Sequence, residues 1–398
     1  MLVANRQNGE KLCLADKWDR NVLAACRNTE PFFCPQCGEK VVLKLGSKRI
    51  WHFAHQQGSW CESQFERESE YHLAGKLAMY RWLINQGVNP VLEKFDPLCR
   101  QKPDIAFVRK DCRYAVEFQC SPISEEIFEK RTNNYKRNGC IPLWILGGKQ
   151  IKRVGATLAD LNSFQFLFLK RMNTGWFLPA FCPESNQFIF LNNTVPISSR
   201  RIISGFAVFT PKQLSLRDLL APQAKKFPLF QKWRTELTKF KTKYAAFRGT
   251  RRDLFLQELY HNRLNIFCLP PEIGLPIPSN PLIETPPLIW QSYLFFDIFQ
   301  YCKPGDIVPF HNVLSTFRTR IKQRQIKLRT IPLAEGESAV RAVHEYMLLL
   351  GQTGCLMMLN QTTFKVINVF QVPGSIPEQI ELEDHFYKKY GSIIENAY

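Results

Sequence analysis

The apolar positions along the chain divide it into three zones of different pattern. Residues 1–61 alternate over short runs, and Val41–Leu45 followed by Gly46–Lys48 predicts a β-hairpin inside a small β module. Residues 62–215 mix helical and strand spacing, whereas residues 216–398 show mainly helical spacing. The pattern therefore predicts an α/β multidomain chain with a mainly helical C-terminal domain.

The middle zone has a defined order of predicted elements. Residues 64–86 have helical spacing, with one stripe of Leu73, Leu77, Tyr80 and Ile84 that ends at Gly87. Strands are expected at 88–95, 104–108 and 114–119, followed by a helix at 124–138 and a buried strand at 141–146. This αβββαβ order is followed by three strand-like runs, at 164–169, 188–191 and 202–209.

The third zone contains a proline-rich interruption. Seven prolines fall within Leu269–Pro287, which cannot be the interior of a helix. We expect an extended connector there that crosses the surface. The apolar segments Ala339–Leu350 and Leu356–Leu359 are expected to belong to the core.

The net charge of the chain indicates what kind of partner it binds. The 398 residues carry a formal net charge of +18, which favours a polyanionic partner, nucleic acid first and an acidic membrane surface second. Residues 221–252 hold ten Lys or Arg, one acid and interleaved aromatics, and residues 317–330 hold six basic residues and no acid. Such runs suit phosphate contacts and base stacking, although amphipathic helices with aromatics in the core explain them equally well.

The cellular setting follows from what the sequence lacks. No apolar run approaches the roughly 18–20 residues of a membrane span, and the first 16 residues lack a signal-peptide pattern, so we expect a cytoplasmic protein without a membrane anchor. The 13 cysteines are then expected to be reduced thiols, a few of which bind metal.

Two acids are the main candidates for chemistry. Asp104 and Glu117 fall on neighbouring predicted strands, and Gln119 shares a face with Glu117. An acid inside an apolar strand is costly to bury unless it binds something, and two converging carboxylates suit Mg²⁺ or Mn²⁺. The pattern favours a metal-dependent nuclease, although a strand-start Asp and an exposed Glu remain the ordinary alternative.

A second metal site is predicted in the first zone. Cys34 and Cys37 have the spacing of a zinc knuckle, and His52 and His55 follow. We assign these four residues to structural Zn²⁺. Since His52 and His55 face opposite ways in a straight strand, Cys61 is the alternative ligand.

The quoted motifs resemble a known family. Pro103-Asp104, Glu117 and Gln119 resemble the PD-(D/E)xK nuclease superfamily. Seven runs over residues 30–148 resemble the competence protein CoiA family: PFFCPQCGEKVVLK, HFAH, ESEYHLAGK, QKPDIAF, AVEFQCSPIS, KRTNNYKRNG and LWILG.

The resemblance implies a role in natural transformation and homologous recombination, on single-stranded or branched DNA, with a recombinase or single-strand-binding protein as partner. It also implies domains at 1–61 (zinc-finger-like), 62–215 (nuclease-like) and 216–398 (basic and helical). The superfamily lysine is replaced by Gln119, which carries no charge and cannot act as a base. A non-catalytic DNA-binding accessory with a degenerate nuclease fold is therefore the alternative function.

Two helices flank the predicted acids. His72 and Glu68 resemble a position from which related nucleases supply a metal ligand, although Glu66 and Glu70 lie closer to the apolar stripe. Lys76 and Arg131 are candidates for the missing positive charge. Together with Tyr135, they are also candidates for DNA contacts, and a plain solvated helix face is the alternative for each helix.

Overall fold

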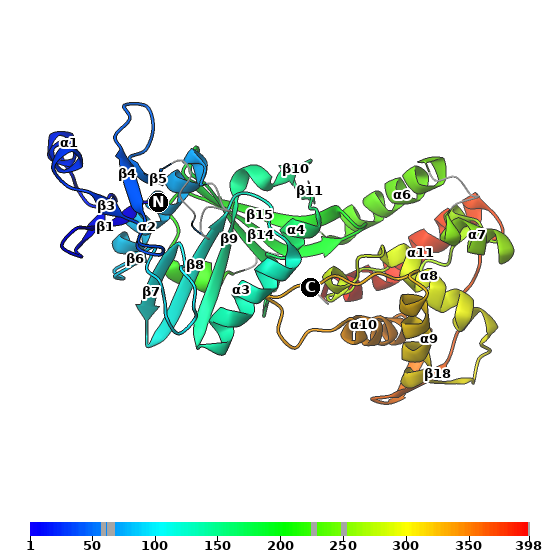
Figure 1. Ribbon diagram of the computed structural model, residues 1–398. Helices are drawn as coiled ribbons and strands as arrows, with labels where there is room; N and C mark the ends of the chain where they lie inside the picture. The colour runs from blue at the N-terminus through cyan, green and yellow to red at the C-terminus, as the bar shows by residue number, and fades with distance from the viewer. Residues whose placement is uncertain (57–60, 62–67, 224–228, 248–252, 397–398) are drawn as a thin grey trace. The chain divides into compact units, whose positions relative to one another are not determined.

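The computed structural model of the chain describes residues 1–56, 61, 68–223, 229–247 and 253–396 (Figure 1). The chain forms two compact units, each built from separate stretches. The first contains Met1–Ile151, Leu178–Phe190 and Ala207–Gln223. The second contains Lys152–Phe177, Leu191–Phe206 and Ala224–Tyr398.

The first unit begins with a small five-stranded sheet. Its strands are β1 (Val3–Arg6), β2 (Lys11–Cys13), β3 (Phe32–Phe33), β4 (Lys40–Lys44) and β5 (His52–His55), in the order β2-β1-β3-β4-β5. The expected hairpin is confirmed as the antiparallel pair β4–β5. Helix α1 (Arg20–Thr29) was not predicted, because Leu23 is the only buried residue it has to mark an apolar face.

Helix α2 (Glu70–Asn85) starts the central part of the first unit. Ser69 caps it by accepting a hydrogen bond from the backbone N–H of His72. The stripe predicted from the sequence is only partly right, since Leu73 is buried but Ile84 is 47% exposed. The buried face is rotated because it includes Gly75 and a charged residue, Lys76, which an apolar pattern cannot reveal.

The predicted αβββαβ order is confirmed, with shorter strands at its start. After α2 come β6 (Val91–Leu92), β7 (Ile105–Arg109), β8 (Cys112–Gln119), α3 (Glu125–Arg137) and β9 (Cys140–Gly147). β7 and β8 form an antiparallel hairpin whose turn, Lys110-Asp111, has positive φ angles of 47° and 62°. β8 and β9 are parallel, as expected for strands joined through a helix, and β9 also pairs in parallel with Ala180 and Phe181.

The strands that follow are shared by the two units. They are β10 (Lys152–Arg153), β11 (Leu158–Asp160), β12 (Lys170–Met172), β13 (Gly175–Cys182), β14 (Gln187–Pro196) and β15 (Arg201–Phe209). The expected strands at 188–191 and 202–209 are confirmed. The one expected at 164–169 is wrong, because Asn162 and Gln165 form a capping box that starts the short helix α4 (Ser163–Phe166) instead. Helix α5 (Leu216–Leu220) closes the first unit.

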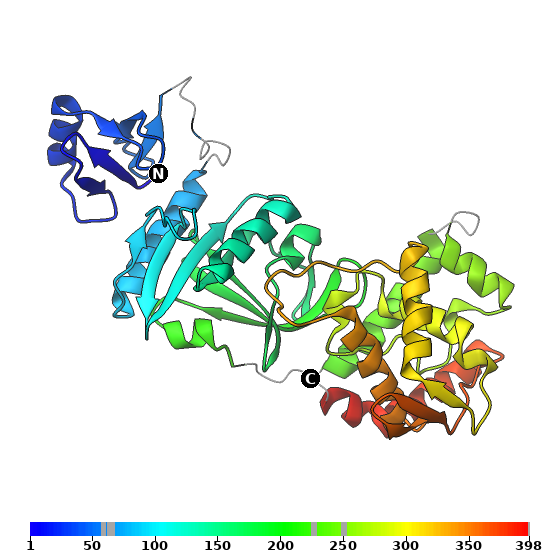
Figure 2. The same cartoon turned by 60° about the horizontal axis from the view of Figure 1, so that its bottom comes forward.

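The second unit is mainly helical beyond residue 224, and Figure 2 shows these helices in green to red. Its helices are α6 (Leu229–Phe247), α7 (Leu254–His261), α8 (Pro287–Asp297), α9 (Phe310–Lys322), α10 (Ala339–Gln352) and α11 (Ile376–Asn396). A three-stranded sheet joins them, made of β16 (Ile307–Pro309), β17 (Leu356–Asn360) and β18 (Thr363–Val366) in the order β16-β18-β17.

Two expectations for this unit are wrong. The proline-rich stretch does not cross the surface: Leu275, Ile277 and Pro281 are buried in the core. Gln291 makes this possible, because its side chain satisfies the backbone of Gly274 and Leu275 in place of a strand or helix. Residues Leu356–Leu359 are also mostly not core, since three of the four are exposed on β17.

Candidate functional site

Asp104 and Glu117 lie side by side on adjoining strands of the first unit. Ile105 pairs with Val116 across β7 and β8, so Asp104, just before β7, is level with Glu117. The backbone N–H of Phe118 donates to Oδ2 of Asp104 at 2.9 Å, which fixes that carboxylate beside β8. The register therefore brings the two acids together as the sequence pattern predicts.

Asp104 is surrounded by cations from helix α2. Its Oδ2 lies 3.2 Å from Nε2 of His72, and its Oδ1 lies 3.5 Å from Nζ of Lys76. Burial alone would raise the Asp104 pKa, but His72 and Lys76 outweigh it and hold the pKa well below its usual range. Burial lowers the His72 pKa, and Asp104 more than reverses that effect. Asp104 is therefore a carboxylate at neutral pH.

Lys76 is the most deeply placed charge in this region. Its side chain is 0% exposed, and its ammonium contacts Glu68 and Oε1 of Glu93, the latter at 2.5 Å. Burial lowers its pKa, but Glu68, Glu93 and Asp104 together hold the pKa well above its ordinary value. Lys76 therefore balances three acids and does not present its charge to solvent.

Glu93 is a participant that the sequence reading missed. It occupies a left-handed position (φ 47°) after β6, and its Oε2 accepts hydrogen bonds from the backbone N–H groups of Leu2 and Val3 at 2.9 and 3.2 Å. The available signal was an acid inside the apolar run 88–95. Glu93 thus connects the start of the chain to Lys76.

Glu117 has a separate set of partners on helix α3. It is 2% exposed, its Oε2 lies 2.6 Å from Nη2 of Arg131, and the hydroxyl of Tyr135 donates to its Oε1. Burial raises the pKa of Glu117 to about 7, although Arg131 opposes the shift. Tyr135 is buried too, so in this structure it braces the acid and offers no surface to DNA.

The side-chain amide of Gln119 forms a local hydrogen bond. It is buried, and its Nε2 donates to the carbonyl of Ser121 at 2.8 Å. The positive charges near the two acids come from α2 and α3 instead. Arg131, 20% exposed, is the cation beside Glu117 that also reaches solvent.

The other candidates belong to α2 or to the segment just before it. Glu68 and His72, the favoured pair, both contact this cluster, through Lys76 and Asp104 respectively. Glu70 is exposed in the first turn of α2. Glu66 lies outside the described residues.

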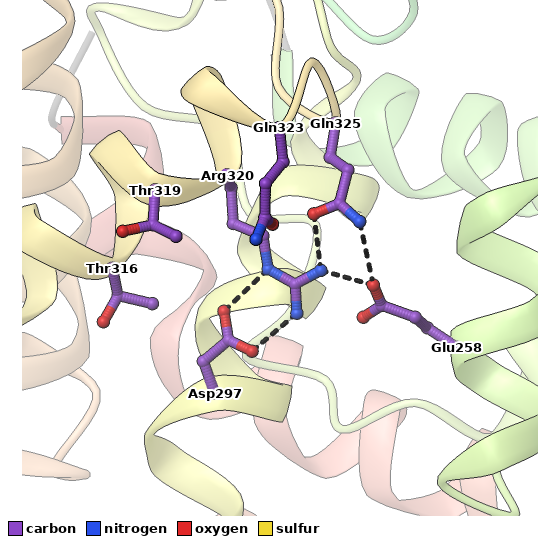
Figure 3. Close-up of a pocket in the computed structure, with 7 residues that line it drawn as sticks. All are labelled: Glu258, Asp297, Thr316, Thr319, Arg320, Gln323 and Gln325. Atoms are coloured by element: carbon purple, nitrogen blue, oxygen red, sulfur yellow. Dashed lines mark hydrogen bonds and ion pairs between the residues drawn. The ribbon is translucent and has the colours of Figure 1, made fainter.

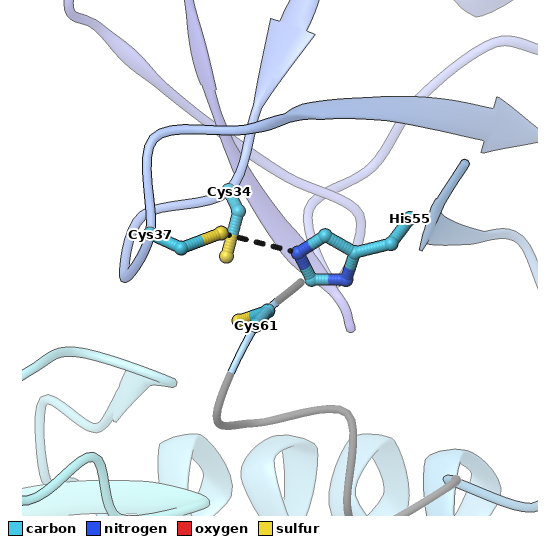
Figure 4. Close-up of side chains that lie close together, drawn as sticks. All are labelled: Cys34, Cys37, His55 and Cys61. Carbon is cyan, nitrogen blue, oxygen red and sulfur yellow. Dashed lines mark hydrogen bonds between the residues drawn. The ribbon is translucent and has the colours of Figure 1, made fainter. Parts of the chain in front are cut away.

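A cysteine-histidine cluster forms the second candidate site, as Figure 4 shows. Ligand atoms of Cys34, Cys37, His55 and Cys61 all lie within 4.8 Å of one another, the only such group of three or more His, Cys, Asp or Glu among the described residues. Cys34 and Cys37 flank a tight turn completed by Gly38 (φ 75°). Burial and the neighbouring thiols raise the pKa of Cys37 to about 12, so without a cation its thiol keeps its proton. This donor set fits Zn²⁺.

The assignment of His52 to this cluster needs correction. Its Nδ1 lies 2.8 Å from the carbonyl of Ile50, and it is not part of the group. β5 pairs with β4 in one unbroken register from His52 to His55, so the two side chains lie on opposite faces of the strand. The alternative ligand, Cys61, takes the fourth place.

A cavity of about 520 Å³ in the second unit is lined by charged and polar side chains, several of which bond to one another (Figure 3). The guanidinium of Arg320 pairs with Asp297 through two hydrogen bonds, at 2.8 and 2.5 Å, and also contacts Glu258. Gln325 completes the set at 2.7 Å. Since four of its five N–H donors are used within the protein, we assign Arg320 to joining α7, α8 and α9.

The basic helix α6 uses much of its aromatic surface for packing. Trp233 is fully buried, and Phe230, Phe240 and Tyr244 pack against the same core. Lys241 and Arg234 pair with acids of α11. Phe227 and the side chain of Phe247 lie outside the described residues. In the described part of α6, these aromatics therefore follow the core interpretation.

Among the described residues, no helix combines the length and the apolar character that crossing a membrane requires.

Three domain models of one protein family match successive parts of the chain and together span most of it. The N-terminal domain model of competence protein CoiA matches residues 15–64, the nuclease-like domain model matches 68–224, and the C-terminal domain model matches 229–380. Competence protein CoiA of Bacillus subtilis (strain 168) is 29% identical over 352 residues, which cover 88% of this chain and 93% of that protein. No solved structure matches the chain significantly.

Proposed function

Since the chain belongs to the competence protein CoiA family, we propose that it acts on incoming DNA in natural transformation as a divalent-metal-dependent nuclease. The observation that carries the proposal is the placing of Asp104 beside Glu117 on adjoining strands of a nuclease-like domain. The αβββαβ order around them supports a PD-(D/E)xK core.

Asp104 and Glu117 would hold Mg²⁺ or Mn²⁺, because carboxylate oxygens are the ligands that these cations prefer. When bound, such a cation lowers the pKa of a coordinated water and stabilises charge on a phosphate. The side chains have their own parts in the proposal. His72 holds Asp104 ionised, and Arg131 supplies the positive charge that Gln119 lacks.

A second function has a specific observation in its favour. Arg131 and Tyr135 already satisfy Glu117, and His72 and Lys76 already neutralise Asp104. A cation would have to compete with these partners. The alternative proposal is therefore a DNA-binding recombination accessory that has kept the nuclease architecture without its chemistry.

Cleavage assays separate the two functions. Single-stranded, double-stranded and branched DNA are incubated with the protein and Mg²⁺ or Mn²⁺, and the wild type is compared with Asp104→Ala and Glu117→Ala. The nuclease proposal expects cleavage by the wild type that both variants lose. Binding of DNA without cleavage of any substrate supports the accessory.

We also propose that Cys34, Cys37, His55 and Cys61 bind one structural Zn²⁺. The proposal rests on the convergence of one imidazole and three thiols. A module of about 60 residues has a small core, so a bound metal would contribute much of its folding free energy.

A further inference from the structure

The first unit contains a cavity that is lined by basic and aromatic side chains. It has a volume of about 580 Å³ and lies where the segment after β2, the β4–β5 connection and helix α2 meet. The side chains that matter are Lys17, Trp18, Lys48, Arg49, Trp51 and Arg81. Its size falls within the range of about 300–1,000 Å³ typical of ligand pockets.

The cations of this cavity are available to a ligand. Lys17, Lys48, Arg49 and Arg81 are all exposed, and none forms a salt bridge with another described residue. Asp16 is the one acid among the described residues that line the cavity. This arrangement differs from α6, where acids of the protein neutralise several lysines and arginines. Four cations against one acid favour a polyanion.

The two tryptophans are also available. Trp18 and Trp51 are half-buried against the core of the small sheet, and neither contacts another aromatic ring or a cation among the described residues. The indole N–H of Trp18 donates to the carbonyl of Cys13 at 2.8 Å, which fixes the orientation of the ring. An indole that is fixed and partly exposed is suited to stacking on an unpaired base.

We propose that this cavity binds single-stranded nucleic acid, with phosphates on the four cations and bases on Trp18 and Trp51. The aromatic pair favours a single strand over a duplex, because bases in a duplex are already stacked and paired. The inference rests on the proposed function and adds to it a binding site for the strand that is distinct from Asp104 and Glu117.

The test measures binding of fluorescent oligothymidylate at several salt concentrations, without added Mg²⁺ or Mn²⁺ so that no strand is cut. Lys48→Ala/Arg49→Ala should weaken binding and make the slope of log K against log [salt] less negative by about 1.4, since each phosphate contact on a single strand contributes about 0.7. The matched control is Lys11→Ala/Lys40→Ala, which removes two exposed cations from the same sheet outside the cavity. Its slope should stay as in the wild type.

Stacking is tested separately. Trp51→Ala should weaken binding roughly 5- to 150-fold, whereas Trp51→Phe should restore most of it because the ring is kept. Circular dichroism and zinc content show whether each variant is folded. Equal slopes for the two double variants, equal affinity of Trp51→Ala and the wild type, or equal binding of a matched duplex would overturn the proposal.

This binding test and the cleavage assay can fail independently of each other. Loss of cleavage in Asp104→Ala with oligothymidylate binding intact leaves this site standing. Cleavage by the wild type, together with binding that is insensitive to Lys48, Arg49 and Trp51, contradicts this site alone.

Discussion

Lys76 illustrates how much one buried charge can determine. Its ammonium is fully enclosed and contacts Glu68, Glu93 and Asp104. A buried ion pair adds little net stability over an apolar pair, but the loss of one partner leaves the others buried without compensation. Lys76 is therefore a structural residue as well as a charged one, since three acids share its ammonium.

Lys76→Met should destabilise the protein by about 3–5 kcal/mol, because Glu68, Glu93 and Asp104 would lose their shared cation. Urea unfolding monitored by circular dichroism measures the change. The control, Lys94→Met, removes an exposed lysine nearby and should cost less than about 0.5 kcal/mol. Equal free energies of unfolding for the two variants would show that the cluster is not a structural unit.

Glu272 predicts a pH dependence in the second unit. Its Oε2 is buried without a hydrogen-bond partner among the described residues, and burial raises its pKa. An acid with a raised pKa stabilises the fold fully at low pH, below its unfolded pKa, and loses that contribution as the pH rises through its folded pKa. The native protein should therefore lose stability at this position as the pH rises.

Glu272→Gln should accordingly gain stability relative to the wild type as the pH rises from about 5 to about 8, because the amide that replaces the carboxyl does not ionise. Thermal melting at both pH values measures the difference. Glu395→Gln, an exposed acid on α11, is the control. A larger relative stability of Glu272→Gln at pH 5 than at pH 8 would contradict the assignment.

The sequence predicted some of these residues and not others. The spacing of Asp104 and Glu117 follows from strand periodicity, so their proximity was foreseeable. Glu68, His72 and Lys76 were also named as candidates beside these acids. The depth of Lys76 and the contacts of Glu93 were not foreseeable, because the alternation of apolar residues carries no information on how buried charges pair.

Helix α2 is the element that positions the site. Tyr71 and His72 lie against the ring of Phe118, with centroid distances of 6.2 and 5.8 Å. Gly75 allows this approach, because a Cβ at that position would overlap the same ring. The close packing of α2 on β8 is what brings His72 to Asp104.

Gly75→Ala should therefore destabilise the protein by about 1–3 kcal/mol, despite the better helix propensity of alanine. Chemical denaturation gives the value. The matched control is Gly351→Ala in helix α10, where the nearest atom is 3.7 Å from the added Cβ, and it should be neutral or slightly stabilising. If Gly75→Ala is as stable as Gly351→Ala, α2 does not pack on Phe118 as described.

The proposed zinc site of Cys34, Cys37, His55 and Cys61 predicts the effect of replacing individual ligands. Purified protein should contain about one zinc per chain, and Cys34→Ser, Cys37→Ser and Cys61→Ser should each lose it. His52→Ala should retain the metal, since its ring contacts Ile50 and not the cluster. Elemental analysis decides the matter, and zinc retained by Cys61→Ser but lost by His52→Ala would restore the first assignment.

At the element scale, the sequence was informative where periodicity is strong. The helix at 124–138 and the strand at 141–146 were expected almost as they occur, because Ser124 caps α3 and β9 is continuously apolar. The prediction of a surface connector at the proline-rich stretch was wrong. The side-chain amide of Gln291 satisfies backbone groups there, which the sequence pattern would assign to contact with solvent.

At the scale of the whole chain, the two compact units do not follow chain order. Segments 152–177 and 191–206 belong to the second unit although they lie between parts of the first. The sequence-based division at 61 and 215 stays a prediction, and it could not place these segments because local pattern does not show which strands share a core. The net charge of +18 does not by itself show where a polyanion would bind, since many of the cations are paired within the protein.

The nuclease proposal makes Asp104 and Glu117 necessary for DNA cleavage. The single-turnover cleavage rate of Asp104→Asn with Mn²⁺ tests it most directly, since asparagine keeps the shape of the side chain and removes its charge. We expect DNA cleavage by the wild type and at least a 100-fold slower rate in the variant, about 2.7 kcal/mol of transition-state stabilisation, with folding and DNA binding retained. Equal rates for the two proteins, or no cleavage by the wild type on any DNA structure, would contradict it.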